Sequence, residues 1–343
     1  MSSRPRESKT EVAVEVSVII PARDEASVIG ACLDALAAQS LGAPALEVIV
    51  VAAGEDDTAG AAALAAARAR FGRFDVVRLA HGNKNAALQV GCARAAAPIV
   101  VLLDADTVLG TDSVEELASA LRDGPERALH GAALPRFDTW VSRYWELNRM
   151  LVKELRFDGQ LSGELIALRR ATLAAHDLAA LFPEAIGAKD DLYLGRALAA
   201  RGCAIGYLPT ARATTLVPWT LAGLAATMLR SRRGAMGLLP LRTASLQAAV
   251  SAVLVGSVPA ALIASHWSLI LAAVCLAPLV SHIAVLASRL ATLRRRGLGD
   301  HRCELPRLLA LDLHGRALKV LTFVERITGR DPPHTFRGQR PAR

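Results

Sequence analysis

Two aspartates separated by a single residue follow a strongly apolar segment of the sequence. Asp104 and Asp106 come directly after Ile99–Leu103, a run of five aliphatic residues that predicts a buried strand. Because residues i and i+2 of an extended segment point the same way, both carboxylates are expected to face one ligand. Two carboxylates without a nearby histidine or cysteine favour a hard divalent cation, Mg2+ or Mn2+, which can bridge a diphosphate. The open alternative is a solvated turn in which Asp106 caps the next helix.

The elements that must position these aspartates alternate between strand and helix. Strands are predicted over 16–20, 46–51, 75–79 and 99–103, and helices over 26–39, 58–70 and 85–96. This alternation predicts an α/β domain with a mostly parallel sheet and helices on both faces. Ligands of such sheets bind beyond the carboxyl ends of the strands. Acidic residues follow three of the predicted strands, at Asp24-Glu25, Glu55-Asp56-Asp57 and Asp104-Ala105-Asp106.

Five segments of the sequence, taken in order, resemble the motifs of family 2 glycosyltransferases. Residues 16–25, VSVIIPARDE, are similar to the family's opening V-S-V-I-I-P-x-x-N-E, with Asp24 in the Asn place. Residues 83–91, NKNAALQVG, resemble its G-K-x-x-A-L-N-x-G stretch, and residues 101–106, VLLDAD, resemble its D-x-D strand. The two later matches are Leu161-Ser162-Gly163 with Arg169-Arg170, and Asp190-Asp191 with Gly202 and Pro209. The resemblance covers about residues 15–240.

The resemblance implies a GT-A fold, which is a nucleotide-sugar-binding sheet with helices on both faces, and transfer of the sugar with inversion. It implies that Asp191, with Asp190 beside it, is the general base that takes the proton from the acceptor hydroxyl. Inversion needs one base opposite the leaving group, and a divalent cation, Mg2+ or Mn2+, neutralises the leaving diphosphate. The other implied roles are Pro21, Glu25, Asp57, Lys84 and Asp104 at the nucleotide-sugar, Asp106 and Asp104 at the metal, and Ser162, Gly163, Arg230 and Arg232 on the acceptor side.

Two departures from the family pattern bear on the substrates. The second strand of the family ends in an Asp that recognises uracil, whereas Ala52 and Ala53 stand here, so the sequence leaves the donor nucleotide open. The Q-x-x-R-W motif of processive members corresponds only to residues 229–233, LRSRR, which lack both Gln and Trp. This favours transfer of single sugars over synthesis of a long polymer. Arg230 and Arg232 are expected either to attract anionic headgroups or a lipid phosphate, or to act only as determinants of topology.

A long uncharged segment near the end of the chain predicts membrane association. The 46 residues 243–288 contain no Asp, Glu, Lys or Arg. As a helix they would be about 69 Å long, roughly twice the hydrocarbon thickness of a bilayer. We therefore expect two transmembrane helices, over 245–264 and 269–287, and a pair of buried core helices is the alternative. Basic flanks predict a multi-pass protein of the cytoplasmic (inner) membrane whose catalytic domain faces the cytoplasm, and residues 305–327 predict an interfacial helix.

The charge of the chain is concentrated in the same region. The chain has 343 residues and a net charge of +8, and residues 289–343 hold 13 Arg and Lys against 5 Asp and Glu. The surplus therefore belongs to a membrane-facing tail. With aromatic residues at only 4%, this distribution argues against a nucleic-acid partner. The predicted divisions are an N-terminal tail (1–14), a nucleotide-sugar-binding half (15–135), an acceptor-side half with a basic interfacial segment (136–242), two transmembrane helices (243–288) and a basic cytoplasmic tail (289–343).

Together these features predict a membrane-anchored, metal-dependent, non-processive glycosyltransferase, and a hexosyltransferase in particular, with a lipid-associated acceptor. Two other hypotheses remain open at this point. The first keeps the chemistry and makes a polysaccharide or oligosaccharide the acceptor. The second is a catalytically inactive membrane scaffold of the same fold, which the changes at Ala52 and in residues 229–233 would suit.

Overall fold

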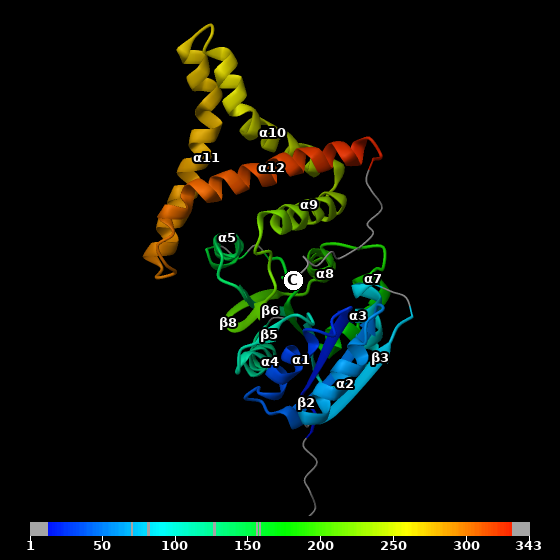
Figure 1. Ribbon diagram of the computed structural model, residues 1–343. Coiled ribbons are helices and arrows are strands. Elements are labelled where there is room, and N and C mark those ends of the chain that lie inside the picture. Colours follow the sequence, from blue (N-terminus) through cyan, green and yellow to red (C-terminus); the bar gives the residue numbers. More distant parts are fainter. Residues whose placement is uncertain are drawn as a thin grey trace, which may run out of the picture. The chain divides into compact units, whose positions relative to one another are not determined.

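The protein is described here from a computed structural model, shown in Figure 1, that places residues 13–69, 71–80, 83–125, 128–155, 157 and 159–330. These residues form two compact units, each made of separate stretches of the chain. The first unit consists of residues up to Ala133, Leu161–Glu184 and Leu194–Thr215, and the second of Leu134–Gln160, Ala185–Tyr193 and the residues from Leu216 onward. Most of the predicted N-terminal tail, and the last part of the basic tail, lie outside the described residues.

An eight-stranded sheet with the order β3-β2-β1-β4-β7-β6-β8-β5 organises the first unit. Strands β1, β2, β3 and β4 pair in parallel, whereas β4–β7, β7–β6 and β8–β5 are antiparallel pairs. The prediction of a mostly parallel sheet, made for the first four strands, is therefore correct, and the antiparallel strands beyond β4 were not predicted. The strands are β1 (Val16–Arg23), β2 (Leu46–Ala53), β3 (Arg73–Arg78), β4 (Ile99–Leu103), β5 (Val108–Leu109), β6 (Ala128–Pro135), β7 (Leu165–Arg169) and β8 (Ile205–Thr215).

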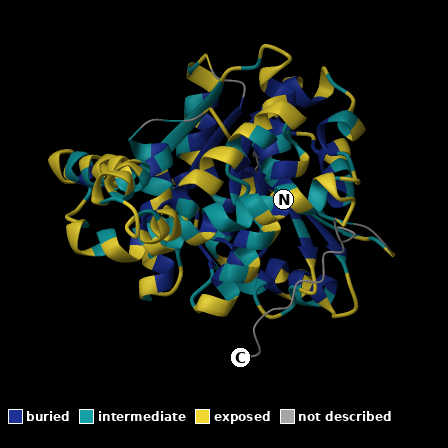
Figure 2. Ribbon diagram, turned by 90° about the horizontal axis from the view of Figure 1, so that it is seen from above, coloured by how far each residue is buried: buried dark blue, intermediate teal, exposed yellow. Residues whose placement is uncertain are grey.

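Helices cover both faces of the parallel strands, as predicted. Alternate residues of β1 and β2, such as Val18 and Val48, are buried in one core cluster with Ile29 and Leu33 of α1. On the opposite face, α3 packs against Ile19 of β1. Strands β1, β2 and β4 are mostly buried, and Figure 2 draws such buried residues in dark blue. The helices that lie in this unit are α1 (Ile29–Ala37), α2 (Thr58–Ala69), α3 (Lys84–Arg94), α4 (Ser113–Asp123), α6 (Arg170–Ala174) and α7 (Leu178–Leu181), with a short helix η1 (Ala43–Ala45).

The second unit is built from helices that follow or interrupt the sheet. It contains α5 (Trp140–Arg149), which continues into η2 (Met150–Glu154), the start of α8 (Asp190–Ala199), α9 (Leu221–Gly237), α10 (Leu241–Ala264), α11 (Leu269–Arg295), η3 (Arg302–Glu304) and α12 (Leu305–Ile327). The predicted interfacial helix over 305–327 has the bounds of α12. Helix α9 ends at Gly237, and Pro240 directly precedes α10 as its N-cap residue.

The two predicted spans form a helical hairpin. Helices α10 and α11 are joined by a turn at residues 265–268, and both are long and apolar enough to cross a membrane by length and composition. Their ends nearest the turn are exposed, with Trp267 at 76% and Leu269 at 81% of full exposure. The other ends are packed, since Leu286 and Leu290 of α11 contact Leu147, Leu151 and Leu308. Figure 1 shows α12 passing across α9 and α10, and both contacts are extensive.

Close packing of α3 on the sheet gives a direct test of the fold. A Cβ added at Gly91 would lie 2.2 Å from Cγ2 of Ile19. We expect Gly91→Ala to lower the free energy of unfolding by about 1–3 kcal/mol. Gly30 of α1 is the matched control, because nothing lies within 4 Å of an added Cβ there, and Gly30→Ala should stabilise by up to about 1 kcal/mol. Urea unfolding of the full chain in detergent measures both, and equal stability of the two variants would contradict this packing.

Candidate active site

The Asp104-Ala105-Asp106 segment forms a turn at the carboxyl end of β4. The backbone N–H of Thr107 donates to the carbonyl of Asp104 at 3.0 Å, and the N–H of Asp104 donates to the carbonyl of Glu164 at 3.2 Å. The extended geometry predicted for the pair is therefore wrong, because the chain turns immediately after Leu103. The alternative in which Asp106 caps a helix is also wrong, since β5 follows and α4 begins only at Ser113.

Lys84 lies against the first of the two aspartates. Its Nζ atom is 2.6 Å from Oδ1 of Asp104, and the two side chains are 34% and 30% exposed. Lys84 is the first residue of α3, and Asn83 caps this helix by accepting the N–H of Ala86. The capped helix start thus holds a lysine beside the turn after β4. The structure brings together a carboxylate and a cation that are 20 residues apart in the sequence.

The second aspartate is half-buried in a group of carboxylates. Burial raises the pKa of Asp106 to about 7, with further increases from the charges of Asp104 and Glu25 and an opposing decrease from Lys84. The hydroxyl of Thr215 donates to Oδ1 of Asp106 at 3.4 Å. The site therefore has an excess of negative charge that a bound cation would offset.

The donor set of this turn fits a hard divalent cation. Asp104 and Asp106 offer carboxylate oxygens, the ligands that Mg2+ and Mn2+ prefer. Among the residues that the structure describes, no group of three or more His, Cys, Asp and Glu side chains could hold a metal ion. Mg2+ is usually bound by one or two carboxylates and completed by substrate phosphates and water.

A network of loop hydrogen bonds fixes the end of β1, where Pro21 and Glu25 were predicted to bind the nucleotide. Asp24 has a positive φ of 54°, and its Oδ1 accepts the N–H groups of Glu55 and Asp56 at 2.7 and 3.2 Å. The N–H of Glu25 donates to Oγ1 of Thr58 at 2.8 Å. These contacts join the loops after β1 and β2. Sequence reasoning missed this bridging role of Asp24, although its position in the motif marked the residue.

Two further predicted residues have structural partners within the same unit. The carboxylate of Asp57 accepts the N–H of Gly60 at 3.0 Å, which caps α2, and lies 3.3 Å from the guanidinium of Arg78. Asp57 thus has a local role whether or not it touches a nucleotide. Pro21 lies within β1, opposite Val51 of β2.

The predicted acceptor segment adjoins the turn after β4. Ser162 and Gly163 precede Glu164, whose carbonyl accepts the N–H of Asp104. This proximity arises because β7 pairs antiparallel with β4 and places Leu165 opposite Leu103. One residue of the site that the sequence did not reveal is Cys32 of α1. Its buried thiol donates to the carbonyl of Asp104 at 3.9 Å, and burial together with the nearby carboxylates raises its pKa.

The polar residues of the NKNAALQ segment hold the chain that leads toward the predicted base. The side-chain amides of Gln89, Asn85 and Asn83 donate to the carbonyls of Phe182, Pro183 and Glu184 at 2.7, 2.8 and 2.5 Å. Six residues after Glu184 the chain reaches Asp190 and Asp191, in the first turn of α8. Spacing alone could not reveal that these amides hold residues 182–184, because the two segments are far apart in the sequence.

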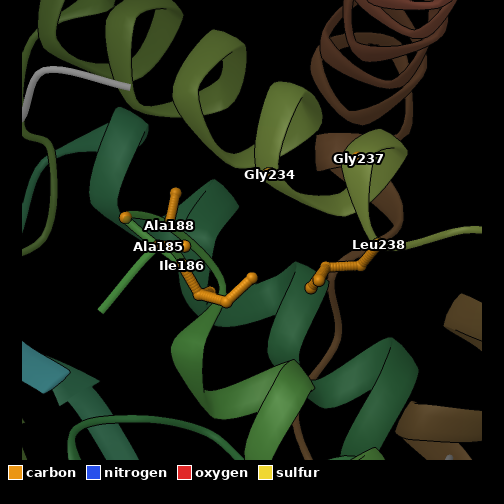
Figure 3. A pocket seen from close by; sticks show the side chains of 7 residues that line it. Ala185, Ile186, Ala188, Gly234, Gly237 and Leu238 are labelled. Carbon is orange, nitrogen blue, oxygen red and sulfur yellow. The ribbon is translucent and has the colours of Figure 1, made fainter. Parts of the chain in front are cut away.

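Asp190, Asp191, Arg230 and Arg232 belong to the second unit. A pocket of about 140 Å3 lies in this unit, between the segment just before α8 and the end of α9. In Figure 3 the side chains of Ile186 and Leu238 point toward each other across it. The approach is close, because a Cβ added at Gly234 would lie 2.9 Å from the carbonyl oxygen of Ala188. The lining is apolar and small, from Ala185, Ile186, Gly187, Ala188, Gly234, Gly237 and Leu238.

The raised pKa of Asp106 predicts a pH-dependent stability. Without metal, the folded protein keeps a proton on Asp106 up to about pH 7 that the unfolded chain releases near pH 4. Stability from this group is therefore lost as the pH rises between these values. We expect Asp106→Asn to match the parent at pH 4 and to be more stable at pH 8 by a few kcal/mol, on the order of the pKa difference.

The measurement is thermal unfolding in EDTA at both pH values. Asp112→Asn, at an exposed residue whose side chain makes no cap hydrogen bond, is the matched control and should leave the pH dependence unchanged. A difference between Asp106→Asn and the parent that is the same at pH 4 and pH 8 would contradict the raised pKa.

Comparison with known proteins agrees with this geometry. Residues 13–234 match the family described as glycosyltransferase like family 2. An N-acetylglucosaminyltransferase from Rhizobium sp. (strain N33) is 28% identical over 219 residues, which is 59% of this chain and 48% of that protein. The chain thus spans about half the length of the curated relative it matches. A mannosyltransferase from Pyrobaculum calidifontis, solved in complex with GDP-Man and Mn2+, superposes with a TM-score of 0.60 at 20% identity over 93% of this chain and 88% of its own.

The family match covers well over half of the chain and contains all five motifs that carried the resemblance. The helices α10, α11 and α12 lie outside the matched residues. The structural likeness extends past the matched region into the C-terminal helices, and at this identity it concerns the fold alone. The mixed sheet with helices on both faces is the GT-A fold. The chain belongs to the family 2 glycosyltransferases.

Proposed function

We propose that this enzyme transfers one sugar from a nucleotide-sugar donor to a lipid-associated acceptor, with inversion and with a divalent metal, at the surface of a membrane. The observation that carries the proposal is the turn after β4, where Asp104 is paired with Lys84 at 2.6 Å and Asp106 is half-buried among carboxylates. A site of this charge is built to take up a cation together with phosphates. The solved mannosyltransferase that shares the fold was crystallised with Mn2+, which supports the metal requirement.

Each residue of the turn has a part in this proposal. Asp106, with Asp104, would hold Mg2+ or Mn2+, which when bound supplies positive charge for the leaving diphosphate. Lys84 would contribute a second positive charge to the phosphates. Glu25 and Pro21, at the end of β1, would border the base and ribose of the donor. Ser162 and Gly163 would border the acceptor, since they precede the residue that bonds to Asp104.

Proton transfer is assigned to Asp191. Inversion requires one base, which removes the proton from the acceptor hydroxyl as the new bond forms. Asp191 and Asp190 are half-buried in the first turn of α8. Carboxylates in the first turn of a helix are also favoured by the helix dipole.

The donor is proposed to be a nucleoside diphosphate hexose whose base is not bound by an aspartate after β2, because Ala52 is buried there. GDP-Man in the mannosyltransferase and the N-acetylglucosaminyl activity named for the relative give two donors to test first. A screen of the purified chain against UDP-, GDP- and dTDP-sugars, scored by nucleotide release with membrane lipid extract present, would identify the donor. If no nucleotide is released from any of these sugar nucleotides, the proposal of a nucleoside diphosphate hexose as donor is contradicted.

Two features of the second unit support a membrane location and a lipid acceptor. Hairpin α10–α11 exposes large apolar side chains around its turn, including Leu262, Ile270 and Val274. Basic residues flank it on both sides, which favours a cytoplasmic orientation at the inner membrane. An enzyme fixed in this way acts on substrates held at the bilayer surface. A polysaccharide acceptor would give a ladder of products on a gel, whereas the proposed reaction gives one.

Removal of the two carboxylates should separate donor binding from chemistry. We expect Asp106→Asn to abolish Mn2+-dependent donor binding and transfer. Asp191→Asn should keep donor binding and lower turnover by roughly 100-fold or more, the usual contribution of a general base. Calorimetry with donor and Mn2+, and release of nucleotide in the presence of acceptor, measure the two steps. Asp112→Asn is the control for loss of a surface carboxylate, and full activity in either site variant would refute the assignment.

Membrane anchoring has its own test. We expect the expressed protein to stay with the membrane fraction after a sodium carbonate wash, because the hairpin buries apolar side chains in lipid. Replacing the exposed Ile270 and Val274 by Lys should weaken this retention, whereas the same replacement at the exposed Leu64 of α2 should not. Complete release of the unmodified protein by carbonate would contradict the anchor.

A further inference from the structure

Three basic side chains gather where α9 packs on α12. They are Arg232 of α9 and Arg316 and Lys319 of α12, and all three are half-buried. Gly315 makes this packing close, because a Cβ added there would lie 3.2 Å from Nη2 of Arg232. The guanidinium of Arg232 therefore lies over the backbone of α12. Arg316 follows Gly315 directly, and Lys319 lies one helical turn further along the same helix.

The negative charge available to this group is smaller than its positive charge. Asp312, also on α12, accepts from Nε of Arg316 at 2.7 Å and hydrogen-bonds Nε2 of His282 at 2.8 Å. Within the described part of the chain, the side chains of Arg232 and Lys319 have no hydrogen bond and no carboxylate at salt-bridge distance. The adjacent Arg233 differs, because its Nε and Nη2 atoms donate to the carboxylate of Glu325 at 2.9 and 2.7 Å.

The shortage of negative charge affects the protonation of the group. Burial lowers the pKa of Lys319 to about 8, and the charges of Arg232 and Arg316 lower it further. Burial likewise lowers the pKa of Arg232. Half-buried cations without partners are costly, and proteins normally pair them or leave them in water. The unpaired cations of this group are therefore complementary to an anion that the chain itself does not supply.

We propose that Arg232, Arg316 and Lys319 form a binding site for the phosphate group of a membrane lipid. Guanidinium groups match phosphate oxygens in a two-point geometry, and several cations together favour an anion with more than one charged oxygen. The Tyr144 hydroxyl, which burial keeps protonated by raising its pKa to about 12, is a further donor in the same group.

The position of the site argues that its phosphate belongs to a lipid. Toward its end α12 exposes the apolar side chains of Leu321, Val324 and Ile327, and α10, which packs on α12, exposes Val250 and Val253. Acyl chains can cover these residues while the headgroup reaches the cations. Binding of this kind requires no sugar donor and no transfer, so it goes beyond the function proposed above and can be tested separately.

The test is flotation of the full chain with two kinds of vesicle, one of phosphatidylcholine alone and one that also contains phosphatidic acid. We expect Lys319→Gln and Arg232→Gln to lower the affinity for phosphatidic acid vesicles at least tenfold, the effect of removing a charged hydrogen-bond partner. Lys319→Arg should restore most of it. Arg242→Gln is the matched control, because Arg242 is exposed at the start of α10 and contributes only general attraction, worth about fivefold.

A second arm distinguishes the source of the phosphate. Calorimetry with inorganic phosphate on the detergent-solubilised chain should show weak binding that disappears in Lys319→Gln if free phosphate is sufficient. Dependence on Lys319 with vesicles alone would assign the site to a lipid headgroup, and either result supports phosphate recognition. Equal losses in Lys319→Gln and Arg242→Gln with vesicles, together with no Lys319-dependent phosphate binding, would overturn the proposal.

Discussion

Repulsion among carboxylates at the ends of β1 and β4 is the constraint on which the first unit depends. The parallel pairing of β1 with β4 brings the end of each strand to the same edge of the sheet, so Glu25 comes close to Asp104 and Asp106. Lys84 relieves part of the repulsion, and burial, with the charges of Asp104 and Glu25 added to it, still raises the pKa of Asp106. A fold keeps such an arrangement only if surrounding structure over-determines it. The loop bonds of Asp24 and the pairing of Glu164 with Asp104 do this here.

The polar residues around the turn after β4 therefore form two classes. Some place a charged group at the carboxyl end of the strands, and others form hydrogen bonds with the backbone of the surrounding loops. Asp24, Thr58, Asn85 and Gln89 direct their polar atoms to loops. Asp104, Asp106 and Lys84 present theirs at the carboxyl end of the strands. Motif matching does not separate these two classes, since residues of both stand in the segments that resemble the family motifs. Asp57 illustrates the difficulty, because its carboxylate caps α2 in a position where the family pattern implies a nucleotide contact.

In the second unit the amphipathic helix α12 has the equivalent organising role. Its Glu325 binds Arg233, and Nη1 of Arg326 donates to the carbonyls of Met236 and Leu239, which closes the end of α9. Asp312 joins α12 to α11 through His282. The helix that follows the hairpin in sequence thus secures the helix that precedes it. Among the described residues, the side chains of Arg232 and Lys319 at the α9–α12 contact have no carboxylate at salt-bridge distance.

The sequence by itself determined the elements whose hydrophobic pattern is unambiguous. The apolar runs of β1, β2 and β4, the two helices of the hairpin and the 3.6-residue pattern of α12 all follow from local periodicity, and the motif order identified the family. Only the tertiary structure decided the antiparallel half of the sheet, because β5 has two residues and β8 is largely polar. It also decided the pairing of Lys84 with Asp104 and of Arg233 with Glu325. Charge partners are chosen by which helices and strands meet, and residue spacing along the chain carries no information about that.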